Sequence, residues 1–372
     1  MSLRKSLLRS GLEGRPGRRH RGIRGPRRQK GVALIVVLMM FAILYVIAIE
    51  VMYRQDRFRA RTENLLEWDA RYQYALAAEA IARRGLLDDL NSDREDGSMV
   101  DDCQDEIWAV NLPPTPYEDA LISATVQDLQ GRFNLNWLVR LEGDQFVRDE
   151  AWRERLALLL AATLTDPGKA ERLSHEMADW LDSNNIVDGI EGAEDAEYRY
   201  RRTANLPAAH ESEMRALLSM RAEDIPEENF WGLFTALPND TRLNINTAPL
   251  PVLDAIFADT VGAAGTQRVA EIRQQGAIDD VGTLLGEPPF NQLETEQRQQ
   301  LAEILDVRSD FFQVMINIQR AQQRSRLITR IHRPAQGASQ VFSRQLVPVM
   351  GPLEAACNPL YEVEQGEGGG ME

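Results

Sequence analysis

Hydrophobic residues are concentrated in one uninterrupted run near the start of the chain. Val32–Ile49 comprises eighteen residues without a charge, which is just enough for a helix to cross a hydrocarbon core of ~30 Å. No proline occurs between Gly31 and Leu112, and apolar residues recur at helical spacing beyond the run. The pattern predicts one helix over 32–90, about 90 Å long at ~1.5 Å per residue, with a membrane-spanning first part.

In its second half the predicted helix carries apolar residues on one side and polar residues on the other, which is typical of a helix packed on a globular domain. The apolar stripe consists of Leu65, Leu66, Trp68, Tyr72, Tyr74, Leu76, Ile81, Leu86, Leu87 and Leu90. From the usual burial preferences we expect Trp68 and the tyrosines in the core of that domain, and the alternative is contact with a partner.

Hydrophobic periodicity changes along the rest of the chain. Residues 121–128 alternate as a strand, and three further alternating runs form a predicted meander at 311–318, 326–332 and 340–347. Helical patterns dominate from Leu138 to Val307, with amphipathic helices over 152–164 and 170–181. Before the first strand, the acidic segment 91–106 is expected to form turns, and the prolines of 113–116 are expected to interrupt regular structure.

The pattern Arg-Φ-Asn-Φ-Asn, in which Φ is an apolar residue, occurs twice, at 132–136 and at 242–246. Each copy precedes a predicted helix, which asparagine is well suited to cap. We interpret the two copies as the openings of two helical subdomains.

The order of these elements predicts an α+β fold. A long N-terminal helix packs on an antiparallel sheet, and a large all-α domain is inserted in that sheet. The predicted parts are a basic leader (1–31), the helix (32–90), a discontinuous α+β domain (91–130 and 308–361), the inserted helical domain (131–307) and a Gly- and Glu-rich disordered tail (362–372).

Charge is distributed unevenly along the chain. Met1–Lys30 contains nine Arg and two Lys against Glu13 alone, so the leader carries +10 and leaves −25 for the remainder of a chain whose net charge is −15. Because basic residues before an apolar span are retained in the cytoplasm, we expect the acidic part in the periplasm of a bacterial cell. That acidity argues against a nucleic-acid partner and is compatible with a cation or a protein.

The residues around Gly31 distinguish kinds of membrane anchor. A secretory signal peptide carries its small-residue cleavage site after the apolar run, whereas here Lys30-Gly31 precedes the run. This junction resembles the site of the type IV prepilin peptidase, which would make Gly31 the last leader residue and Val32 the N-methylated mature N-terminus. Prepilins carry Glu as the fifth mature residue, where this chain has Val36. Such a subunit is a poor repeating unit but can cap a filament.

Carboxylates and amides gather in the segment 179–195, after a predicted helix. Calcium prefers six to eight oxygen ligands, and candidate ligands here are Asp182, Asn184, Asp188, Glu194 and Asp195. The spacing is not that of an EF-hand, because Ala193 occupies the twelfth position. From the residues alone, a solvated acidic loop is the simpler interpretation.

Other candidate chemistry is limited. Cys103 and Cys357 both follow the apolar run, so in an oxidising compartment either a disulfide or two free thiols is compatible with the sequence. The four histidines are scattered, and no Walker loop or Gly-x-Ser-x-Gly elbow is present. We therefore expect no enzymatic activity.

Residues 241–286 resemble a helix-hairpin-helix, with Gly262-Ala-Ala-Gly265 between two predicted helices. In DNA-binding versions the hairpin places backbone N–H groups on phosphate. The surrounding residues are acidic, which favours a structural role. A periplasmic DNA-uptake protein is kept as the alternative function.

Taken in order, five stretches resemble the minor pseudopilin K family of bacterial type II secretion (general secretion pathway protein K). They are the Lys30–Ile35 junction, Asp128–Asn136, Asp179–Asp182 with Gly192–Asp195, Asn244–Ala248 and the terminal strands. The resemblance implies an inner-membrane subunit matured by the prepilin peptidase, with structural calcium bound in the inserted domain. It also implies a place at the pseudopilus tip beside the minor pseudopilins I and J, where the subunit initiates and caps the filament that exports folded proteins.

Overall fold

The computed structural model describes residues 31–357, apart from 105, 111, 188, 190, 227 and 228. The predicted leader up to Lys30 and the predicted disordered tail lie outside the described residues. The chain divides into two compact units, 1–66 and 67–372.

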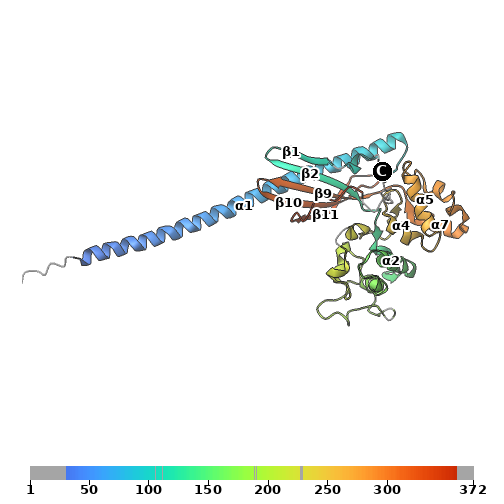
Figure 1. The fold of residues 1–372 in the computed structure, drawn as a ribbon, viewed down its shortest axis with the longest axis horizontal. Helices are drawn as coiled ribbons and strands as arrows, with labels where there is room; N and C mark the ends of the chain where they lie inside the picture. Colours follow the sequence, from blue (N-terminus) through green and yellow to red (C-terminus); the bar gives the residue numbers. More distant parts are fainter. Residues whose placement is uncertain are drawn as a thin grey trace, which may run out of the picture. The chain divides into compact units, whose positions relative to one another are not determined.

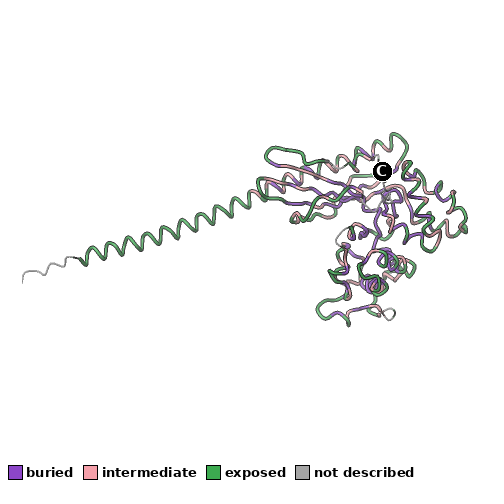
Figure 2. Tube along the Cα trace, in the orientation of Figure 1, coloured by how far each residue is buried: buried purple, intermediate pink, exposed green. Residues whose placement is uncertain are grey.

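A single helix, α1, runs from Val32 to Asp96 and therefore extends six residues further than predicted. Within the described residues it is the one helix that is long and apolar enough to cross a membrane. Residues 32–66 are solvent-exposed throughout (Figure 2). This exposure is consistent with a helix whose apolar surface is covered by lipid or by other subunits.

The sheet contains five antiparallel strands in the order β1-β2-β9-β10-β11 (Figure 1). Their bounds are β1 (Leu112–Tyr117), β2 (Ala120–Asp128), β9 (Phe311–Arg320), β10 (Gln323–His332) and β11 (Gln340–Val347). The predicted strands and meander are confirmed. The prolines of 113–116 do not prevent a strand, because β1 is an edge strand and an edge tolerates residues without an N–H donor. They do interrupt its pairing, since the register with β2 shifts between Leu112 and Thr115.

The second half of α1 covers one face of this sheet (Figure 1). Ala75, Ala78 and Leu86 of the helix form a core with alternate residues of the strands, among them Val314 and Ile316. The match between small helix residues and β-branched strand residues allows the helix to approach the sheet closely.

The predicted apolar stripe is only partly buried. Leu86 and Leu90 are buried, but Leu65, Leu66, Trp68 and Ile81 are exposed, so the expectation that Trp68 lies in the core is wrong. At Glu67, which pairs with Arg320, the helix has reached the turn between β9 and β10. Trp68, the next residue, stacks on Tyr72 of its own helix, with ring centroids 5.5 Å apart.

Residues 131–307, called the helical block below, connect β2 to β9. Its α-helices are α2 (Glu150–Thr163), α3 (Ala170–Leu181), α4 (Leu250–Phe257), α5 (Ala263–Arg273), α6 (Val281–Leu285) and α7 (Thr295–Ile304). Short 3-10 helices lie at Leu135–Leu138, Pro167–Lys169, Glu211–Ala216, Ala222–Asp224, Phe230–Leu233 and Phe290–Gln292, and a further one precedes β1 at Ile107–Ala109. The helical prediction is too broad between 183 and 243, where these short turns and irregular chain replace α-helices.

Short strand pairs complete the block. They are β3 (Phe133–Asn134) with β6 (Phe234–Thr235), β4 (Val139–Glu142) with β5 (Gln145–Arg148), and β7 (Leu243–Asn244) with β8 (Leu305–Asp306). The two Arg-Φ-Asn-Φ-Asn copies form β3 and β7, each in a parallel pair.

The asparagines of this motif do not cap α-helices as predicted. Asn134 Oδ1 accepts from the N–H of Asn136 and caps a 3-10 helix, and Asn244 Oδ1 accepts from the N–H of Asn246. The N-cap of α4 is Pro249, without a side-chain cap. The motif therefore turns the chain sharply at the entrance to each subdomain, because a short asparagine side chain satisfies backbone donors that a turn exposes.

The structure joins Cys103 and Cys357 in a disulfide. The bond holds the segment after β11 against the sheet, where Gln127 Nε2 donates to the carbonyl of Ala355 (2.7 Å). Arg326 Nη2 donates to the carbonyls of Gly351 and Pro352 (3.0 and 2.7 Å). Of the two states that the sequence left open, the structure contains the disulfide.

Candidate functional site

Three carboxylates converge at the end of α3. Asp179 lies in the last turn of the helix, Asp182 is its C-cap residue, and Glu194 comes from the loop that follows. One oxygen of each lies within 4.8 Å of the others, and all three side chains are buried. The three residues are called the carboxylate centre below.

The C-terminal end of α3 is an unfavourable place for three carboxylates unless a cation compensates their charge. A helix carries partial negative charge at its C-terminus, which disfavours further carboxylates there. The guanidinium of Arg148 lies 3.7 Å from Asp179 Oδ1 and supplies one positive charge for three carboxylates. Burial, together with the charges of Asp182 and Asp195, raises the pKa of Glu194 to about 7.

The oxygen donors match what calcium requires. Glu194 Oε2 accepts from the hydroxyl of Thr203 (3.0 Å), whereas Glu194 Oε1 is buried and has no hydrogen-bond partner among the described residues. A buried acceptor without a donor is costly, and a divalent cation would satisfy it. Oxygen-only donors of high negative charge are those of calcium sites, so the residues present fit this ion.

The predicted calcium ligands separate into three groups in the structure. Asp182 and Glu194 belong to the carboxylate centre. Asn184 lies next to it, where its Nδ2 donates to Asp182 Oδ1 (2.9 Å) and its Oδ1 accepts from the N–H of Ile186 (2.7 Å). Asp195 Oδ1 accepts from the N–H and hydroxyl of Thr203, and Asp188 lies outside the described residues.

Asp179 was not predicted as a ligand. Its spacing of three residues from Asp182 places both on one side of the last helical turn, and this spacing could have indicated the pair from the sequence.

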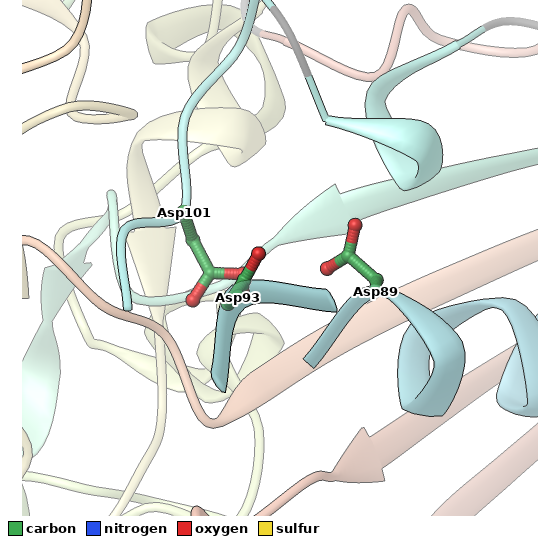
Figure 3. Close-up of side chains that lie close together, drawn as sticks. All are labelled: Asp89, Asp93 and Asp101. Atoms are coloured by element: carbon green, nitrogen blue, oxygen red, sulfur yellow. The ribbon is translucent and has the colours of Figure 1, made fainter. Parts of the chain in front are cut away.

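A second acidic cluster was not predicted at all. Asp89 and Asp93 at the end of α1 converge with Asp101 (Figure 3). Arg333 Nη1 donates to Asp89 Oδ2 (2.9 Å) and Arg333 Nη2 to Asp101 Oδ1 (2.6 Å). Since a guanidinium already occupies the space between Asp89 and Asp101, we assign this cluster to the connection between α1 and the end of β10.

The electrostatics of the second cluster are unusual. Burial raises the pKa of Asp101 to about 7, against the opposing effect of Arg333. The pKa of Asp93 is raised to about 6 by burial and by the nearby charge of Asp89. Burial and a hydrogen bond with Asp89 raise the pKa of Glu106 to about 10. Part of the cluster is therefore protonated near neutral pH.

The predicted cleavage junction coincides with the start of α1. Val32 is the first helical residue, and Gly31 precedes it with φ +141°, a conformation that favours glycine. Val36 is in the second turn and half exposed. Cleavage and N-methylation here stay predictions.

The helix-hairpin-helix-like part consists of α4 and α5 with Gly262 between them. The arginines of α5 are already engaged. Arg268 pairs with Glu287 (2.6 Å). Arg273 is buried and donates to the carbonyls of Ile245 and Ala248. These contacts disfavour phosphate binding at the hairpin.

Comparisons with known proteins agree on one family. Two models of the family "Type II secretion system (T2SS), protein K" match residues 131–227 and 243–308. The type II secretion system protein K of Pseudomonas aeruginosa is 29% identical over 326 residues, which cover 86% of this chain and 93% of that protein. The protein K of Aeromonas hydrophila is also 29% identical, over 81% of this chain and 92% of that protein.

Among solved structures, a chain of the crystal structure of the GspK-GspI-GspJ complex from the enterotoxigenic Escherichia coli type 2 secretion system has the same fold. The TM-score is 0.63 at 23% identity, and the match covers 78% of this chain and all of that one.

Proposed function

Because the chain belongs to the type II secretion system protein K family, we propose that it is a minor pseudopilin that initiates and caps the pseudopilus. The observation that carries this role is the helical block, inserted between β2 and β9 of a helix-and-sheet scaffold. Both family models match within this block, and the similar solved chain comes from a complex with GspI and GspJ. We infer that the corresponding pseudopilins I and J are the partners of this chain.

Two features support a place at the tip. The helical block adds bulk that a further subunit above it would have to avoid. Val36 stands where prepilins carry Glu, so the chain lacks the carboxylate that would pair with the N-terminal amine of the next subunit in the apolar environment. Assembly then ends with this subunit, and the proposed role requires no bond chemistry from the chain.

Maturation follows from the N-terminal segment. We infer that the prepilin peptidase cleaves after Gly31, that Val32 becomes N-methylated, and that Val32–Ile49 holds the subunit in the inner membrane before assembly. The basic leader favours a cytoplasmic N-terminus and a periplasmic globular part.

The experiment that tests this maturation determines the mature N-terminus in cells with and without active prepilin peptidase. A start at methylated Val32 that depends on the peptidase is the expected result. An intact leader, or a cut after Ile49, would contradict the assignment.

We further propose that calcium binds at the carboxylate centre as a structural ion. Asp179, Asp182 and Glu194 would hold it, and the ion would neutralise the charge at the end of α3 and tie that helix to the loop. The melting temperature is expected to rise with excess calcium over chelator in the wild type. The rise should be lost in Glu194→Gln and retained in Glu223→Gln, since Glu223 is exposed and distant in the chain. Equal melting temperatures with calcium and with chelator in the wild type would refute the proposal.

A DNA-uptake role is not favoured. The described arginines of α4 and α5 are engaged with carboxylates or carbonyls, and the chain after the leader carries −25.

A further inference from the structure

One segment of the helical block exposes basic and apolar side chains together. Residues 199–202, Arg-Tyr-Arg-Arg, are exposed in succession, and the Tyr200 side chain is 86% exposed. Ile186 and Leu206 beside this segment are 70% and 60% exposed. These six residues are called the basic loop patch.

The patch is held firmly at both ends. Tyr198 is buried and packs edge-on against Trp180, with ring centroids 5.7 Å apart. Thr203 is buried, and its hydroxyl donates to Glu194 Oε2 and Asp195 Oδ1 (3.0 Å each). Fixed ends reduce the conformational entropy that a loop loses when it binds a partner.

Asn205 joins the two flanks of the patch. Its Nδ2 donates to the carbonyl of Asn184 (2.9 Å) and to Asn185 Oδ1 (3.1 Å). The segments that carry Ile186 and Leu206 are thereby held side by side, so the two apolar side chains belong to one surface with the arginines.

The arginines of the patch have weak internal partners. Arg199 lies over the ring of Tyr200 and Arg201 over that of Tyr198, at 5.1 and 6.0 Å from the ring centroids. Arg202 is 88% exposed and lies 3.8 Å from Asp195. Exposed contacts of this kind contribute little to stability. The stability of the fold therefore does not explain why three arginines occur here.

Other arginines of the same block are paired at short distance. Arg153 contacts Glu171 at 2.8 Å and Arg140 contacts Glu142 at 2.8 Å. The basic loop patch brings three exposed arginines together in a chain that is otherwise strongly acidic.

We propose that the basic loop patch binds a locally acidic surface of another protein. Arginine and tyrosine are the residue types that contribute most to protein interfaces, and the flanking Ile186 and Leu206 supply apolar area around them. The acidic surface must be local, because an extended polyanion would also meet the −25 charge of the chain.

The same argument disfavours two other occupants. An anionic membrane attracts nearby arginines but is repelled by the rest of the acidic chain. A second copy of this chain brings a second strongly acidic body. The inference goes beyond the tip role.

A photoreactive amino acid in place of Tyr200, in the full chain in its native membrane, tests the proposal. The matched control carries the same amino acid in place of Leu158, an exposed residue of α2. The Tyr200 position is expected to yield an adduct with one protein, attached within a segment rich in Asp and Glu, that the Leu158 position does not yield.

Reversing the charge of the patch arginines tests whether the adduct at position 200 depends on their positive charge. Arg201→Glu with Arg202→Glu should reduce the adduct about tenfold or more, whereas the control pair Arg172→Glu with Arg221→Glu, also exposed, should leave it unchanged. An unchanged melting temperature verifies folding of both pairs. No adduct, an adduct with lipid or with a second copy of the chain, or equal loss in both pairs would overturn the proposal.

Discussion

Arg333 offers the most direct test of how α1 is held to the rest of its unit. Its side chain is 1% exposed and lies over the ring of Phe312, 4.5 Å from the ring centroid. Besides the bonds to Asp89 and Asp101, Nη1 donates to the carbonyl of Leu86 (3.1 Å) and Nη2 to that of Ser309 (3.0 Å). We consider the substitution Arg333→Leu, which keeps apolar volume and removes the charge.

The expected loss can be estimated from these contacts. Removing one partner of a buried ion pair costs about 3–5 kcal/mol, because the remaining charge is left buried and uncompensated. Here two carboxylates lose their partner, although Asp101 retains the N–H of Ser309 as a donor (2.8 Å). We therefore expect the free energy of unfolding to fall by about 4 kcal/mol. For a unit as large as 67–372 this corresponds to a decrease of roughly 6 °C in melting temperature.

Thermal unfolding of the full chain in detergent, followed by tryptophan emission, is the appropriate assay. All six tryptophans lie in the unit 67–372, so the signal reports on the domain that contains Arg333. Arg324→Leu, at an exposed position of the same strand, serves as the control and should change stability by less than about 0.5 kcal/mol.

A loss below about 1 kcal/mol for Arg333→Leu would refute the reasoning, since the ion pair would then contribute no more than a surface contact. Lowering the pH should recover part of the loss in this variant, because protonation removes the unpaired charge from Asp101.

Four further outcomes are expected. Burial raises the pKa of Asp101 from 3.8 to about 7, so the stability that this group contributes at low pH is lost as the pH rises from about 4 to about 7. Relative to Asp101→Asn the wild type should lose stability in that interval, and parallel pH profiles would contradict this. Cys357→Ser should lower the free energy of unfolding by about 2–4 kcal/mol. Equal melting temperatures of the variant and the wild type, both measured without reductant, would argue against a formed disulfide. Calcium should slow trypsin cleavage after Arg201 and Arg202, because Thr203 connects them to Glu194. Equal cleavage rates with calcium and with chelator would show that the proposed ion does not restrain this loop. Finally, Val36→Glu should impair assembly and secretion, and unchanged secretion would show that the missing carboxylate does not explain the tip position.

Short-range patterns predicted most of the fold. The strand β11 and the helix α3 have the bounds expected from periodicity, because the spacing of apolar residues that identifies each of them lies within a single element. Burial of α1 residues was predicted less well. The side of a helix that is apolar can be read from the sequence, but the point at which the supporting sheet ends is set by strands more than 200 residues further along the chain, at Arg320.

In the candidate site, too, local patterns could be predicted from the sequence and long-range contacts could not. Asp182 and Glu194 were predicted because they lie in one acidic loop, and Asp179 could have been added from its helical spacing. Asp89 and Asp101 could not be connected to Arg333, since no local pattern links residues so far apart. Their proximity is created by the packing of α1 against the sheet.

The ends of the helical block meet at adjacent strands. Asp128 of β2 pairs with Phe312 of β9, and the N–H of Leu129 donates to the carbonyl of Phe311 (3.0 Å). The chain therefore leaves the sheet at the end of β2 and returns to it at the start of the neighbouring strand β9, so the helical block is an insertion at one point of the scaffold. The size of the block can change during evolution without disturbing strand register. A short hairpin joining β2 to β9 would leave a scaffold of α1 and the five-stranded sheet, onto which other modules could be grafted.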